Sequence, residues 1–205
     1  MSLALVEDTL PHLSPTVADM LRLQLLAGAR SGEICILRAR DINMSGTVWL
    51  YRPRQHKTEH RGFGRVIPLG PKAQEIVKCY LKPNVEAYLF SPRDAMEARR
   101  HKLRQERKTK VQPSQQDRRK RKPRRLPGER YTPAALGHAV RVACERHGLE
   151  HWHPHQLRHS KATEIRREYG LDAARAVLGQ HAPQVTELYA ELDLNKAVEV
   201  ARKLG

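Results

Sequence analysis

Apolar residues recur every three to four positions in several stretches of the chain, a pattern that predicts helices with one buried face. The clearest stretch is "TVADMLRLQLLAG" at 16–28, where Ser14 and Pro15 form a start signal and Gly28 a stop signal. The same pattern predicts further helices over residues 31–39, 71–82, 134–148, 171–179 and 185–205, the last broken near Asp193.

Two runs rich in β-branched and aromatic residues interrupt the helices: "TVWLY" at 47–51 and "RVIPL" at 65–69. A basic turn containing "RQHKTEHRG" joins them, which predicts an antiparallel pair. With 205 residues, of which 40% are hydrophobic, the chain can bury one sizeable core. We therefore expect a mainly α (α+β) fold over residues 1–205, a helical domain with a small antiparallel sheet.

Positive charge is concentrated in one part of the chain. The sequence holds 38 Lys and Arg against 22 Asp and Glu, a formal charge of +16, which favours a polyanionic partner. Residues 93–125 alone hold 15 of the basic and 4 of the acidic residues, with almost no large apolar side chains. Such a segment buries too little surface to offset its ordering entropy, so we expect a basic, mobile insert at about residues 93–130.

Two interpretations of this insert stay open. It is either a solvated loop or an arm that lies along DNA and adds affinity that does not depend on sequence. In the second case its DNA-binding residues are Arg118, Arg119, Lys120, Arg121, Lys122, Arg124 and Arg125.

The cysteines and the length of the apolar runs bear on the compartment. Cys35, Cys79 and Cys144 are widely scattered, with no C-x-x-C pair, which is typical of reduced thiols in the cytoplasm. No run of about 18 apolar residues occurs, and the N-terminus lacks a signal pattern. We therefore expect a cytoplasmic protein that does not contact membranes.

The stretch "HWHPHQLRHSKAT" at 151–163 combines a helix start with candidate chemistry. His153 and Pro154 predict a cap and a first helical position. His155 and Arg158 then lie on one face, near the helix start, where free amides and the helix dipole favour an anion. A zinc site is disfavoured, because Pro154 and the helix break the alternation of the histidines. From these residues alone, a structural role and a phosphate-binding role are equally supported.

Four segments, taken together and in order, resemble the tyrosine recombinases, the phage integrase family. The first resembles the segment around the family's first arginine, the second its β-hairpin lysine, the third its His-x-x-Arg box, and the fourth its C-terminal segment with the nucleophilic tyrosine. They are "LLAGARSGEICILRARDI" at 25–42, "HKT" at 56–58 followed by "RVIPL", "HQLRHSKAT" at 155–163 and "LGQHAPQVTELYAE" at 178–191.

The resemblance implies a phosphate-binding half of an active site. Arg30 and Arg158 would grip the scissile phosphate, and His155 would hydrogen-bond to it. Glu33 would orient these groups without touching the phosphate. Two guanidiniums can stabilise the charge that develops on a phosphodiester under attack, so this chemistry requires no metal and no cofactor.

The resemblance also implies a reacting half. Tyr189 would attack the phosphate to give a 3′-phosphotyrosyl intermediate, and Lys57 would protonate the leaving 5′ oxygen. The family usually has His or Trp directly after the Leu-Gly pair, but here Gln180 occupies that position and His181 follows. Spacing favours Gln180 as the phosphate contact and chemistry favours His181, so both stay candidates.

The expected function is site-specific DNA recombination or integration, by strand transesterification on double-stranded DNA in the bacterial cytoplasm or nucleoid. The resemblance implies self-association, as a tetramer on DNA. We expect the family's N-terminal DNA-clamping domain to be absent from this chain, which would then be the catalytic domain of a longer protein. Two alternatives remain: DNA relaxation of the type IB topoisomerase kind, and a non-catalytic DNA-binding relic of an integrase.

Overall fold

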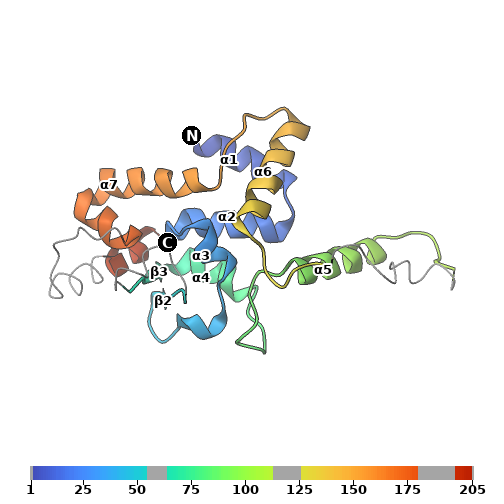
Figure 1. The fold of residues 1–205 in the computed structure, drawn as a ribbon, viewed down its shortest axis with the longest axis horizontal. Coiled ribbons are helices and arrows are strands. Elements are labelled where there is room, and N and C mark those ends of the chain that lie inside the picture. The colour runs from blue at the N-terminus through green and yellow to red at the C-terminus, as the bar shows by residue number, and fades with distance from the viewer. Residues whose placement is uncertain (1, 55–63, 113–125, 180–196, 205) are drawn as a thin grey trace.

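The computed structural model describes residues 2–54, 64–112, 126–179 and 197–204 (Figure 1). Helices dominate, and residues 197–204 form a last helical stretch. The elements are α1 (Leu3–Thr9), η1 (Leu10–His12), α2 (Pro15–Ala27), α3 (Ser31–Cys35), η2 (Ala39–Asp41), β1 (Ile42–Asn43), β2 (Trp49–Tyr51), β3 (Ile67–Leu69), α4 (Pro71–Lys78), α5 (Pro92–Gln105), α6 (Pro133–His147) and α7 (His155–Leu178).

The three strands form one small antiparallel sheet in the order β1-β2-β3. Tyr51 in the middle strand pairs with Ile42 on one side and Ile67 on the other. Trp49 and Tyr51 are both buried, so the sheet carries part of the core. The expected mainly helical fold with a small antiparallel sheet is confirmed, and the sheet has a third strand, β1, that the sequence pattern did not indicate.

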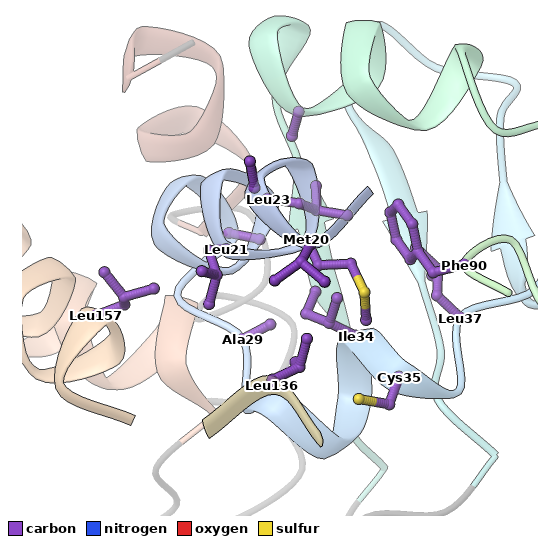
Figure 2. Packing of buried hydrophobic residues seen from close by; sticks show 14 of the residues in the cluster. Met20, Leu21, Leu23, Ala29, Ile34, Cys35, Leu37, Phe90, Leu136 and Leu157 are labelled. Atoms are coloured by element: carbon purple, nitrogen blue, oxygen red, sulfur yellow. The ribbon is translucent and has the colours of Figure 1, made fainter. Parts of the chain in front are cut away.

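Helix α2 lies at the centre of the hydrophobic core. Figure 2 shows Met20, Leu21 and Leu23 of this helix surrounded by side chains from several other elements. Leu157 of α7 and Leu136 of α6 are among the residues packed in this cluster. The helix starts at Pro15 and ends before Gly28, as predicted, and Gly28 has the left-handed conformation, φ 61°, in which glycine is favoured.

Two predicted helices are shorter in the structure. The helix expected over 31–39 ends at Cys35, because Leu37 and Arg38 are drawn into extended pairing with residues 88 and 89. Leu37 is fully buried there, so its apolar character reflects a buried extended segment. The helix expected over 71–82 ends at Lys78.

Helix α7 joins two helices that the sequence pattern separated. It starts directly after Pro154, and the backbone amide of His153 donates to the Gln156 side chain, which closes the first turn. Its one internal break is Gly170, at φ 85° and ψ 176°, which accounts for the two separate helical patterns. Gln24 of α2 donates to the Pro154 carbonyl at 2.7 Å and so ties the start of α7 to the core.

The first part of the basic insert forms a helix that the sequence pattern did not indicate. Helix α5 extends away from the body of the molecule (Figure 1), and none of its residues is buried. Pro92 stands at its first turn, and the Ser91 hydroxyl accepts a hydrogen bond from the Asp94 amide. In the described parts of the chain, no helix is both long and apolar enough to cross a membrane.

Candidate active site

Arg30 directly precedes α3 and Glu33 lies in its first turn, and their side chains form a salt bridge. One Glu33 oxygen accepts from the Arg30 backbone amide at 2.7 Å, and the other from the Arg30 guanidinium at 2.8 Å. Glu33 is buried, whereas the Arg30 side chain keeps 22% of its surface exposed. The buried carboxylate therefore orients the Arg30 side chain, part of which stays accessible to a ligand.

Arg158 reaches the same region from α7. It is only 5% exposed, and its guanidinium donates to the Gly28 carbonyl at 2.6 Å and to the Leu178 carbonyl at 2.7 Å. Because an arginine has five N–H donors, these two bonds fix its orientation and leave further donors available. The side chain thus links the end of α2 with the end of α7.

Arg65, two residues before β3, completes the group. Its Nε donates to Glu33 at 3.4 Å, and its Nη1 donates to the Val177 carbonyl at 3.1 Å. This residue is not among the site residues predicted from the sequence. An arginine directly before the apolar run "VIPL" was a weak signal, because its partners are far away along the chain.

Positive charge exceeds negative charge in this group, since Arg30 and Arg65 both pair with the single carboxylate of Glu33 and the charge of Arg158 lies nearby. Burial, together with the neighbouring charges of Arg65 and Arg30, lowers the pKa of Arg158 to about 10, while Glu33 acts in the opposite direction. Burial would raise the pKa of Glu33, but Arg65 and Arg30 outweigh it and hold that pKa below its ordinary value. Such an excess of preorganised guanidinium groups is suited to an anion such as a phosphate.

His155 is the first residue of α7 and is exposed, so the two members of the His-x-x-Arg pair have different surroundings. Its ring packs edge-on against the ring of His159, with centroids 4.8 Å apart. Arg158, one turn later, is directed into the protein. The imidazole is accessible from solvent, as a group that contacts a bound ligand must be.

The remaining predicted residues lie outside the described parts of the chain. They are the general acid Lys57, the alternative phosphate contacts Gln180 and His181, the nucleophile Tyr189, and the basic run of Arg118, Arg119, Lys120, Arg121, Lys122, Arg124 and Arg125. The described residues that flank them are informative, because Arg65 follows the segment of Lys57 and Gly179 precedes the segment of Tyr189. Within the described ranges, no group of three or more His, Cys, Asp or Glu side chains is arranged to hold a metal ion.

Two curated relatives are tyrosine recombinases of Pseudomonas putida. XerC of strain KT2440 is 36% identical over 74 residues, which are 36% of this chain and 25% of that protein. XerC of strain W619 is 29% identical over 140 residues, which are 68% of this chain and 38% of that protein. The chain therefore spans well under half the length of these relatives.

Solved structures of similar fold come from the same group of proteins. XerH site-specific recombinase bound to its difH substrate superimposes with a TM-score of 0.51 at 15% identity, covering 95% of this chain and 53% of that chain. The Tn1549 transposon integrase in complex with circular intermediate DNA gives 0.54 at 13% identity, covering 96% of this chain and 66% of that chain. At such identities the likeness concerns the fold alone.

The sequence profile of the phage integrase family matches residues 8–196, nearly the whole chain. The match spans the segments that carry Arg30, Arg65 and Arg158, and it also spans the segment of Tyr189. The fold and the family match agree with the resemblance seen in the four sequence segments. The chain belongs to the phage integrase family.

Proposed function

We propose that this chain is the catalytic domain of a site-specific DNA recombinase, which cleaves and rejoins strands by metal-independent transesterification. One observation carries the proposal: Arg30 and Arg65 both pair with the buried carboxylate of Glu33, and the buried guanidinium of Arg158 lies near enough for their positive charges to lower its pKa. Such a group has surplus donors and surplus positive charge for the non-bridging oxygens of a phosphodiester. His155, exposed at the start of α7, supplies a further donor to the same phosphate.

The reaction consists of two exchanges at phosphorus. The Tyr189 hydroxyl passes its proton to a neighbouring base and its oxygen attacks phosphorus, the bond from phosphorus to the 5′ oxygen breaks, and Lys57 gives a proton to that oxygen. The product is a 3′-phosphotyrosyl bond and a free 5′ hydroxyl. In the second exchange a 5′ hydroxyl attacks and the tyrosine leaves, so the number of phosphodiester bonds is conserved and no ATP is consumed.

The proposed partner is double-stranded DNA, supported by the formal charge of +16 and by the basic insert. Arg118 to Arg125 would add contacts with the backbone. Exchange between two duplexes breaks four strands, each at its own tyrosine, and this requirement supports a tetramer on DNA. Bacterial relatives support the cytoplasm or nucleoid as the compartment.

The test uses nicked duplexes of pooled sequence, in which cleavage releases a short downstream fragment and so traps the intermediate. The protein and its Tyr189→Phe variant are incubated with them in EDTA, denatured in SDS and examined for a covalent protein–DNA band. The proposal expects a band with the wild type and none with the variant. Sequencing of the trapped DNA would then begin to define the target site. A band that persists in Tyr189→Phe would contradict the assignment of the nucleophile.

Two alternative functions predict different results. Relaxation of supercoiled plasmid, without any joining of two DNA sites, would support a type IB topoisomerase activity. A DNA-binding relic predicts no covalent band and equal DNA affinity for the wild type and Tyr189→Phe. The chain spans only part of its relatives' length. The relic is therefore concluded only if a chain extended at its N-terminus to the relatives' length also forms no covalent band.

A further inference from the structure

Arg65 is a buried arginine that the proposed reaction does not use directly. It is 5% exposed, and it interacts with groups from three parts of the chain: Glu33 of α3, the Val66 carbonyl of its own segment and the Val177 carbonyl of α7. Within the described residues its Nη2 has no hydrogen-bond partner. A buried charge is costly unless it is well paired, so this one calls for an explanation.

We propose that Arg65 is a positioning residue of the active site. It holds Glu33 in the orientation that aligns Arg30, and it fixes the C-terminal end of α7, from which the segment of Tyr189 continues. The inference rests on the proposed function, because it takes Arg30 and Arg158 as the phosphate ligands. Arg65 acts through these neighbours, because its Nε and Nη1 are engaged by Glu33 and by the Val66 and Val177 carbonyls.

Glu33 is shared between Arg30 and Arg65. Its two carboxylate oxygens both accept hydrogen bonds from Arg30, one from the backbone amide and one from the guanidinium. The oxygen that accepts from the guanidinium also accepts from Nε of Arg65. Arg65 is the leading cause that lowers the Glu33 pKa against the effect of burial. Without it, the buried carboxylate would lose its main stabilising charge, and the salt bridge that orients Arg30 would weaken.

Two arginines bind the C-terminal end of α7. Arg65 donates to the Val177 carbonyl and Arg158 to the Leu178 carbonyl, so two guanidiniums bind consecutive carbonyls at the negative end of the helix dipole. Gly179 follows in the left-handed conformation, φ 59°. A Cβ on Gly179 would lie only 2.4 Å from Nη1 of Arg65, so the arginine occupies the space that any other residue would need. Arg65 therefore packs against Gly179 and fixes the backbone at the end of α7.

The contacts of residue 65 require the branched side chain of an arginine. The fork of Arg65 spans acceptors on two sides, with Nε towards Glu33 and Nη1 towards Val177. A lysine carries the same charge at a single point and cannot span both acceptors. The variant Arg65→Lys therefore keeps the charge but loses the connection between α3 and α7.

The experiment compares Arg65→Lys and Arg65→Gln with Arg141→Gln, a control that removes an exposed arginine paired with Glu145 on α6. Folding is checked first by circular dichroism and thermal unfolding. The rate of covalent complex formation at saturating nicked DNA and the affinity for DNA are then measured well below the unfolding midpoint. We expect Arg65→Lys to fold, to bind DNA within about twofold of the wild type, and to cleave roughly 10- to 100-fold more slowly. Arg141→Gln should keep the wild-type rate.

If Arg65 had a purely structural role, Arg65→Lys would lower the unfolding midpoint but leave the cleavage rate of the folded protein unchanged. That result would overturn the inference, while the proposed function would stand. If neither this chain nor the N-terminally extended chain forms a covalent complex, the proposed function fails and a second readout decides. Orthophosphate should raise the unfolding midpoint of the wild type more than that of Arg65→Lys, at equal ionic strength. Equal shifts, or none in the wild type, overturn the inference.

Discussion

At the scale of single residues, Glu33 shows how the site is held together. The residue is 2% exposed, and its carboxylate pairs with the guanidiniums of Arg30 and Arg65. The backbone carbonyl of the same residue accepts from the Tyr51 hydroxyl at 2.7 Å, so the sheet supports it as well. An ion pair at this depth gives little net stability, yet the loss of one partner leaves the other charge buried and uncompensated.

The first prediction follows from the lowered pKa of Glu33. A carboxyl group whose pKa is lower in the folded than in the unfolded state stabilises the fold above its unfolded value, here the ordinary 4.5. That contribution is lost as the pH falls through the lower folded value. We expect Glu33→Gln to lower the free energy of unfolding by about 3 kcal/mol at pH 7, and by progressively less as the pH falls from 4.5 through the lower folded pKa. Urea unfolding across this pH range measures both.

The matched control for this prediction is Glu145→Gln, which removes an exposed carboxylate paired with Arg141 on α6. Surface pairs of this kind contribute little, so its effect on the free energy of unfolding should be small at every pH. If Glu33→Gln and the wild type lost stability with identical slopes below pH 5, the ion pair would not be the source of the acid sensitivity.

At the scale of elements, α5 is a helix that no packing explains. It buries none of its side chains, and exposed Met96 and Leu103 contribute nothing to the core. Its sequence instead consists largely of residues with high helix propensity, with a serine cap and a proline at the first turn. The helix extends from the body of the molecule (Figure 1), so its basic side chains are accessible to a binding partner and do not stabilise the core.

We predict that α5 binds the DNA backbone. Neutralising Arg99, Arg100 and Arg104 together to Gln should weaken DNA binding without changing the unfolding midpoint, because none of these side chains is buried. Each phosphate contact that is lost reduces the slope of log K against log salt by about 0.9. Fluorescence anisotropy with a labelled duplex, measured over a series of salt concentrations, gives the slope directly.

The control removes the same number of exposed charges elsewhere, with Lys72, Arg141 and Arg146 changed to Gln on α4 and α6. It alters the net charge equally but leaves α5 intact. If both triple variants reduced the salt slope by the same amount, the effect would come from net charge and α5 would have no specific role in binding.

At the scale of the whole molecule, local signals account for what the sequence could predict. Arg30, Glu33 and Arg158 are predicted as site residues because each lies in a short motif beside a helix end. Arg65 was missed because its partners are 32 and 112 residues away, and no local pattern records such a distance. The residues after Cys35 look helical by periodicity, but their pairing with residues 88 and 89 makes them extended.

Helix α1 is another long-range feature, since it packs beside α6 and beside the loop that leads into α7 (Figure 1). Thr9 is fully buried at its end, donates to the Leu5 carbonyl at 2.7 Å and accepts from the Trp152 indole at 3.0 Å. The bond joins residues 143 positions apart, and it anchors the loop from which α7 carries Arg158 to the site.

The last prediction concerns this bond. Thr9→Val keeps the shape of the side chain but leaves the buried Trp152 N–H without its acceptor, which should lower the free energy of unfolding by about 1–3 kcal/mol. Thr163→Val is the control, because Thr163 is exposed and donates only within its own helix; its effect should stay within about 0.5 kcal/mol. Urea unfolding followed by tryptophan fluorescence measures both. Equal stability of the two variants would mean that α1 is held by apolar packing alone, and that the loop before α7 does not depend on the N-terminal helix for its anchor.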